Sequence, residues 1–145
     1  MKTPKTLIEK DYEINNQKVK KIELNTHLIK HDNFIFLNIK RGVKKKVFVN
    51  EIICCQADGN YTTFYFANRK KYSLYYTLSE VEDFLKEFNF LRVTRSYIIH
   101  PTHIDEINCN SKPSIILSNE IKLDISKSKI KEIEQFLAKN YKCFT

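Results

Sequence analysis

The sequence is poor in the features that mark nucleotide-binding loops and membrane spans. It has only two glycines, Gly42 and Gly59, and they stand alone, so there is no glycine-rich loop to cradle phosphates. No apolar run approaches the ~18–20 residues that span a bilayer. The N-terminus also lacks the unbroken apolar core of a secretory signal. We therefore expect a cytoplasmic protein without a membrane partner.

Reactive motifs are scarce as well. The four cysteines form no C-x-x-C pair, which argues against a zinc knuckle, and the serines lack a G-x-S-x-G elbow. Adjacent Cys54 and Cys55 would point to opposite faces of a strand. We interpret the cysteines as small buried or half-buried thiols. We therefore predict no enzyme activity, no catalytic residues and no cofactor.

What the chain does have is positive charge. Its 145 residues, enough for one domain, include 25 Lys and Arg against 17 Asp and Glu, which gives a net charge of +8. This excess favours an anionic partner such as nucleic acid, acidic lipid or an acidic protein. The basic residues fall repeatedly where turns or strand ends are expected, at Lys44–Lys46, Arg69–Lys71, Arg92 and Arg95, and Lys127 and Lys129.

The apolar pattern divides the chain at about residue 30. Residues 1–30 are expected to be a tail, and 31–142 a domain of many short strands. A capping box at Thr77 begins a predicted amphipathic helix over 78–88, and Ser126 is expected to cap a final helix. The pattern predicts a mostly antiparallel β fold. The strand-like runs are 34–40, 47–49, 52–57, 61–66, 71–76, 90–93, 97–99, 104–109, 114–117 and 120–125.

Two other functions remain open on the residues alone. His100, His103 and Asp105 offer two nitrogens and an oxygen to a metal-dependent enzyme, but no further ligand is evident, and structural histidines are favoured. Four tyrosines could stack unpaired bases in a single-stranded nucleic-acid module, although such residues more often pack across strands. These are Tyr61, Tyr65, Tyr72 and Tyr76.

Three segments in order carry a family resemblance. They are "IICCQADGNYT" at 52–62, "FLRVTRSYII" at 90–99 followed by "HIDEI" at 103–107, and "ISK" at 125–127. Over residues 34–140 the chain resembles the LytTR DNA-binding domain of bacterial transcription regulators. The resemblance implies an elongated, mostly β fold that lays loops into successive grooves of duplex DNA.

The family's three DNA-contacting loops are carried over by position. The first maps to Asn60, Tyr61 and Thr62, the second to the residues around Arg95, and the third to Lys127 beside Ser126. The resemblance thus implies a sequence-specific transcription regulator without a helix-turn-helix. With neighbouring basic and polar residues, the predicted DNA-binding set is Asn60, Tyr61, Thr62, Arg92, Thr94, Arg95, Ser96, Ser126, Lys127 and Lys129.

The chain departs from the family pattern at three positions. Members often have histidine at Thr94, asparagine at His100 and arginine at Lys127. Because lysine cannot make the planar two-pronged contact with guanine, Lys127 is expected to read bases weakly or to bind a phosphate. Most members also carry a receiver or sensor domain ahead, where this chain has about thirty residues, so we expect a stand-alone regulator or one controlled from outside the chain. With no heptad zipper, we expect a monomer in solution and two copies on repeated half-sites.

Overall fold

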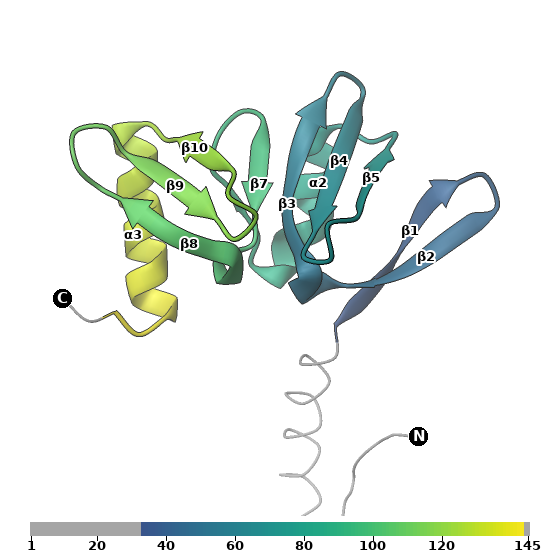
Figure 1. Ribbon diagram of the computed structural model, residues 1–145, viewed down its shortest axis with the longest axis horizontal. Helices are drawn as coiled ribbons and strands as arrows, with labels where there is room; N and C mark the ends of the chain where they lie inside the picture. Colours follow the sequence, from purple (N-terminus) through teal and green to yellow (C-terminus); the bar gives the residue numbers. More distant parts are fainter. Residues whose placement is uncertain (1–32, 144–145) are drawn as a thin grey trace, which may run out of the picture. The chain divides into compact units, whose positions relative to one another are not determined.

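The computed structural model describes residues 33–143. The chain divides into two units after Ile35, and the described residues belong to the second unit apart from 33–35. The tail predicted over residues 1–30 lies outside the described residues. Ten strands and two α-helices follow one another along the described chain (Figure 1). They are β1 (Phe34–Lys40), β2 (Val43–Phe48), β3 (Ile52–Asp58), β4 (Tyr61–Phe66), β5 (Lys71–Leu74), α2 (Leu78–Leu85), β6 (Leu91–Arg92), β7 (Tyr97–Ile99), β8 (Ile104–Asn108), β9 (Ser114–Leu117), β10 (Lys122–Asp124) and α3 (Lys127–Asn140).

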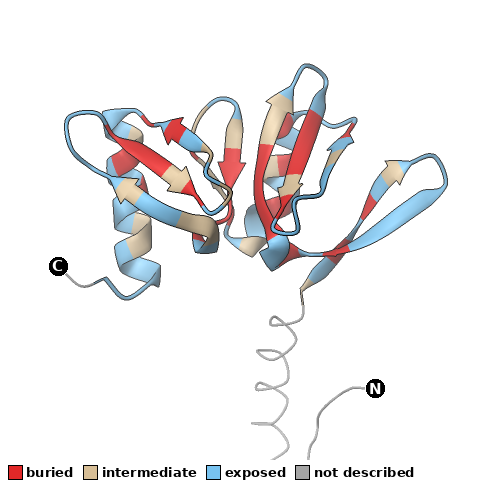
Figure 2. Ribbon diagram, viewed as in Figure 1, coloured by how far each residue is buried: buried red, intermediate tan, exposed pale blue. Residues whose placement is uncertain are grey.

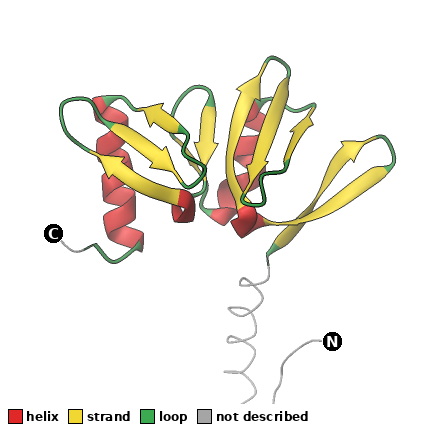
Figure 3. Cartoon of the chain, viewed as in Figure 1, coloured by secondary structure: helices red, strands yellow, loops and turns green. Residues whose placement is uncertain are grey.

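The strands form three sheets. Neighbouring strands of the five-stranded and the three-stranded sheet pair antiparallel. A ribbon of β1 and β2 precedes a five-stranded sheet in the order β5-β4-β3-β7-β6 and a three-stranded sheet in the order β10-β9-β8. Helix α2 packs against β3, β4 and β7, and α3 lies along the three-stranded sheet (Figure 3). The predicted mostly β fold with a mid-chain and a C-terminal helix is confirmed.

Strand β3 is buried on both faces, as its apolar run from Ile52 to Cys55 requires. Cys54 belongs to a core cluster that also holds Ile99 of β7, Ile115 of β9 and Ile133 of α3. That cluster therefore joins the two larger sheets and the last helix. Cys55 is equally buried but lies outside the cluster, on the other face of the strand. Figure 2 shows the buried run along β3 in red. The opposite orientation predicted for the adjacent cysteines is confirmed.

The helix starts follow from local capping. The Thr77 side chain accepts a hydrogen bond from the Glu80 N–H at 3.2 Å, and the Glu80 carboxylate accepts one from the Thr77 N–H at 2.8 Å. This reciprocal pair is the predicted capping box. Ser126 caps α3 by accepting from the Lys129 N–H at 3.2 Å. Both predicted helix starts are confirmed.

Three local predictions need correction. Helix α2 ends at Leu85, a 3₁₀ turn spans Lys86–Phe88, and Asn89 takes a left-handed φ of 68° that stops the helix. The basic run Lys44–Lys46 lies on β2, because the turn uses only the two residues before Val43. Strand β5 ends at Leu74, short of the predicted 71–76.

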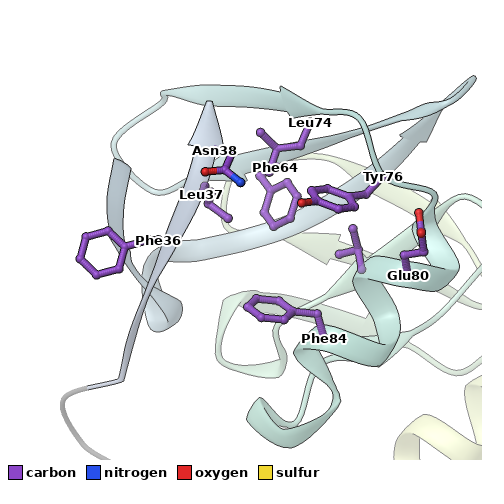
Figure 4. Close-up of a pocket in the computed structure, with 9 residues that line it drawn as sticks. Phe36, Leu37, Asn38, Phe64, Leu74, Tyr76, Glu80 and Phe84 are labelled. Atoms are coloured by element: carbon purple, nitrogen blue, oxygen red, sulfur yellow. The ribbon is translucent and has the colours of Figure 1, made fainter. Parts of the chain in front are cut away.

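The helical spacing of Leu78, Val81, Phe84, Leu85 and Phe88 predicts one apolar face, and Phe84 departs from it. Its side chain is 51% exposed, and it lines an open apolar pocket of about 320 Å³. The pocket lies between α2, β1 and the face of β4 and β5, and Figure 4 shows Leu37, Phe64 and Tyr76 around it.

The two glycines occupy the turns that the sequence marked. Gly42 and Gly59 have φ values of +77° and +61°, in the left-handed region that other residues avoid. Gly42 joins β1 to β2 and Gly59 joins β3 to β4. None of the helices in residues 33–143 has the length and apolar character to cross a membrane.

Candidate nucleic-acid interface

The first two predicted segments meet at one end of the five-stranded sheet. Strand β3 runs into the turn that contains Asn60, and β7 begins beside that same end, because Gln56 pairs with Tyr97. The Ala57 N–H donates to the Ser96 carbonyl at 2.9 Å, which continues the pairing one step further. The Asn60 turn and the 94–96 loop therefore lie at the same end of the five-stranded sheet (Figure 1).

The second segment is a hairpin formed by the two short strands predicted at 90–93 and 97–99. Strands β6 and β7 pair antiparallel through Leu91 with Ile99 and Arg92 with Ile98, and the Val93 N–H donates to the Tyr97 carbonyl at 3.0 Å. The chain reverses at 94–96. This reversal places Arg95 at the hairpin tip, where its side chain is exposed.

Arg92 holds that tip in place from within the hairpin. Its guanidinium donates to the Glu82 carboxylate at 2.9 Å, to the Thr94 carbonyl at 3.1 Å and to the Arg95 carbonyl at 2.6 Å. The Ser96 N–H adds a bond to the Thr94 hydroxyl at 3.1 Å. Arg92 is half-buried and occupied by three acceptors, so its position suits it to shaping the loop around Arg95.

This clamp gives a stability prediction. Arg92→Ala should lower the free energy of unfolding by ~1–2 kcal/mol, because it leaves two loop carbonyls without a charged donor. Glu82→Gln should lower it by less than ~1 kcal/mol, since that ion pair is partly exposed and the carbonyl contacts remain. Urea unfolding of both variants measures the difference. An equal loss in the two variants would show that the ion pair, and not the loop contacts, supports the hairpin.

The second and third predicted segments face each other across an open hollow of about 510 Å³. The hairpin contributes Thr94 and Arg95, and the start of α3 contributes Ser126 and Lys129. Arg92 and Val93 complete the hairpin side, while Asp124 supplies a carboxylate next to the helix. Of the three cations in the lining, Arg92 and Lys129 are paired with Glu82 and Glu132, and Arg95 has no ion pair with a described residue. The exposed Arg95 makes the hollow suited to an anionic group.

The start of α3 adds its own positive field. The N-terminal N–H groups of a helix carry partial positive charge and favour anions such as phosphate. Ser126 and Lys127 are both exposed here, so they are accessible to a ligand. Lys129 makes a 3.0 Å ion pair with Glu132, one helical turn on, which is solvent-exposed and weak. Of the two lysines, Lys127 is therefore the one more available to an external anion.

The three predicted residues of the first segment differ in their exposure to solvent. Asn60 is exposed in the turn, and Tyr61 is exposed with its ring edge-on to Tyr75 at 5.3 Å between centroids. Thr62 is fully buried, and its hydroxyl donates to the Tyr76 carbonyl at 2.8 Å. The Thr62 side chain therefore anchors the strand end beneath the turn, and the groups that face solvent are Asn60 and Tyr61.

The tyrosines considered for base stacking divide into two pairs. Tyr65 is half-buried and donates to the Gln56 side chain at 2.9 Å, and Tyr72 packs edge-on against Phe66 at 5.7 Å. Tyr61 and Tyr76 are exposed. Tyr65 and Tyr72 thus serve the sheet, which leaves the other two able to offer a ring to solvent.

The histidines considered as metal ligands are engaged in hydrogen bonds. His103 donates from Nε2 to the Asn50 carbonyl at 2.7 Å, and its Nδ1 lies 3.1 Å from the Ser118 hydroxyl. His100 is buried, and its Nδ1 accepts from the Thr102 N–H at 3.2 Å. Within residues 33–143 no three His, Cys, Asp or Glu side chains are grouped to hold a metal ion. His27 and His31 lie outside the described residues.

The buried thiols are poor nucleophiles. Burial raises the pKa of Cys54 to about 12, against a small opposing effect of its hydrogen bond to Asn119. Burial also raises the pKa of Cys55 well above its ordinary value, and the neighbouring Cys54 adds to this. Because the thiolate is the reactive form, burial makes both cysteines unreactive, and they serve as packing residues of the core.

Comparison with known proteins bears on the family and the fold of the chain. The sequence model of the LytTr DNA-binding domain family matches residues 43–138. A solved structure described as the LytTr DNA-binding domain of a response regulator from Bacillus cereus is similar in fold, with a TM-score of 0.58 and 21% sequence identity. That alignment covers 72% of this chain and 95% of the other. No curated protein matches this sequence. The family match spans well over half of the chain, so the protein belongs to the LytTr DNA-binding domain family.

Proposed function

We propose that this protein is a transcription regulator that recognises a specific duplex DNA sequence through three surface segments. These are the Asn60–Tyr61 turn, the hairpin tip at Arg95 and the start of α3 at Ser126 and Lys127. The observation that carries the proposal is the cationic hollow, in which the second and third segments come together from distant parts of the sequence. A charged, open surface of this kind suits a polyanion better than a small apolar ligand.

The segments are proposed to divide the work of recognition. Arg95 is an exposed arginine on a braced loop, so it can place its planar guanidinium against a guanine edge. Lys127 and the N-terminus of α3 suit a phosphate, because a lysine acts as a point charge and the helix end favours anions. Arg92 and Thr62 are proposed to position the loops without reaching DNA themselves.

The proposed stoichiometry is a monomer in solution that occupies repeated half-sites as two copies. Light scattering of the purified protein should give the mass of one chain without DNA. Titration onto an operator with two half-sites should give two chains per duplex. A tight dimer in the absence of DNA would contradict this part of the proposal.

Arginine 95 provides the direct test. Arg95→Ala should weaken binding to the preferred duplex by ~1–3 kcal/mol and relax the preference at one or two base pairs, because a bidentate contact with one base edge is lost. Lys127→Ala should weaken binding about equally on every duplex and reduce the salt slope by about one contact. Both residues are exposed, so neither change removes a buried contact.

The measurement starts from duplexes selected from a random pool by the wild-type protein. The affinities of both variants are then compared on the best duplex, a scrambled duplex and the corresponding single strand, with folding checked by circular dichroism. Folded Arg95→Ala protein with wild-type affinity on every duplex would place the recognition surface elsewhere. Tighter binding to the single strand than to the duplex would favour base stacking on Tyr61 and Tyr76.

A further inference from the structure

The end of the β1–β2 ribbon carries a concentration of positive charge that lies outside the three recognition segments. Five of the seven residues from 40 to 46 are Lys or Arg, and no Asp or Glu occurs between residues 33 and 50. Lys40, Arg41, Lys44 and Lys45 are all exposed. In contrast, Leu37 near the base of the ribbon is buried. The ribbon is thus fixed at its base and exposed on both faces at its tip.

Four exposed cations of this tip lack a charged partner among the described residues. They are Lys40, Arg41, Lys44 and Lys45. Lys44 Nζ instead donates a hydrogen bond to the neutral Asn38 side-chain oxygen at 2.9 Å. Like charges close together on a two-stranded ribbon repel one another, which makes this arrangement unfavourable for the free protein. An external polyanion would relieve the repulsion.

We propose that the tip, residues 40–45, is an arm that binds the phosphate backbone of the duplex beside the base pairs read by the three segments. This inference rests on the proposed function and extends the length of duplex that the protein contacts. The β1–β2 turn and the β3–β4 turn extend to the same side of the 49–51 junction in Figure 1. The arm would add affinity without sequence information, because lysines meet phosphates as point charges.

Duplex DNA suits the arm better than an acidic peptide does. DNA carries one charge per ~1.7 Å of its axis and continues past any single contact, so one duplex can span both the recognition segments and the arm. The arm's exposed side chains are Lys40, Arg41, Val43, Lys44 and Lys45, with no exposed aromatic anchor from 40 to 45. The exposed side chains of residues 40–45 are therefore mainly cationic, which suits a contact with the phosphate backbone of DNA.

The test compares two triple variants of the full chain with equal loss of charge. The arm variant is Arg41→Gln, Lys44→Gln and Lys45→Gln. The control is Lys86→Gln, Lys139→Gln and Lys142→Gln, three exposed positions after α2 and at the far end of α3. Lys139 is twelve residues along α3 from Lys127, roughly 18 Å at the helical rise. Each protein is titrated, from 50 to 200 mM salt, with the selected duplex bare and with ~15 flanking base pairs on each side.

On the flanked duplex, but not on the bare one, the arm variant should have a smaller salt slope than the wild-type protein. If three phosphate contacts disappear, the salt slope falls by about 2.7, so wild-type affinity drops about 40-fold more than the variant's over this range. The control should match wild type, and a variant with Arg41→Lys, Lys44→Arg and Lys45→Arg should keep the wild-type slope. A wild-type slope for the arm variant, or an equal loss in the control, would overturn the arm while leaving the proposed function intact. Wild-type protein that binds no duplex would overturn both.

Discussion

Raising the salt concentration from 50 to 200 mM should weaken the binding of this protein to duplex DNA by a factor on the order of 10³ or more. Each phosphate neutralised by a Lys or Arg releases condensed counterions, and about six such contacts give a loss of this size. The net charge of +8 and the exposed cations at Arg95, Lys127 and the ribbon tip motivate this number of contacts. Fluorescence anisotropy of a labelled duplex at four or more salt concentrations gives the slope directly.

The same titration needs a check on the protein itself. Circular dichroism at each salt concentration separates weaker binding from a change in folding. Lys127→Ala and the arm variant then apportion the slope between the start of α3 and the ribbon. A nearly flat response in folded wild-type protein would contradict an electrostatic mode of binding, and with it the role assigned to the cationic hollow.

Lowering the pH from 7 to 4 should reduce the free energy of unfolding by up to about 3 kcal/mol through His100 alone. Burial, followed by the nearby His103 as the lesser cause, lowers the pKa of His100 to about 4, whereas an unfolded histidine titrates near 6.5. The unfolded chain therefore binds a proton at a higher pH than the folded chain. The contribution of His100 to the free energy of unfolding is fully present above about pH 6.5, decreases as the pH falls, and levels off below about pH 4.

The geometry explains why the folded protein resists this proton. The His100 ring packs edge-on against Phe90 at 4.8 Å and lies 5.9 Å from His103. Its Nδ1 accepts the Thr102 N–H, so a proton added there would displace that bond. Charging the ring thus places an ion in a mostly apolar site next to a second imidazole.

The control for this effect is His100→Asn. An asparagine can still accept the Thr102 N–H but does not titrate, so the histidine contribution to the pH dependence should disappear. Urea unfolding at pH 7, 5.5 and 4.5 measures both proteins, and their difference removes the carboxylate titrations that they share. Parallel stability curves for the two proteins would show that His100 does not control the acid sensitivity.

Local sequence signals determined most of the secondary structure. Strands 34–40, 61–66, 97–99 and 114–117 have the predicted bounds, since each is a β-branched or apolar run between turn residues. The caps at Thr77 and Ser126 depend only on neighbours three residues away. Interactions at so short a range are legible in the sequence. The three proposed recognition segments were inferred from the family resemblance, and their placement relative to one another did not follow from periodicity or charge.

Tertiary structure decided which of the candidate residues face solvent. Thr62 and Arg92 look like surface residues in the sequence, but Thr62 is buried under Tyr76 and Arg92 is engaged with Glu82 and the hairpin carbonyls. The sequence also did not show that the Arg95 hairpin would lie across a hollow from Ser126. That meeting depends on the pairing of β3 with β7 and on the core shared by β3, β9 and α3. Such contacts join residues far apart in the chain, so only the packing of the whole domain places the cations on one surface.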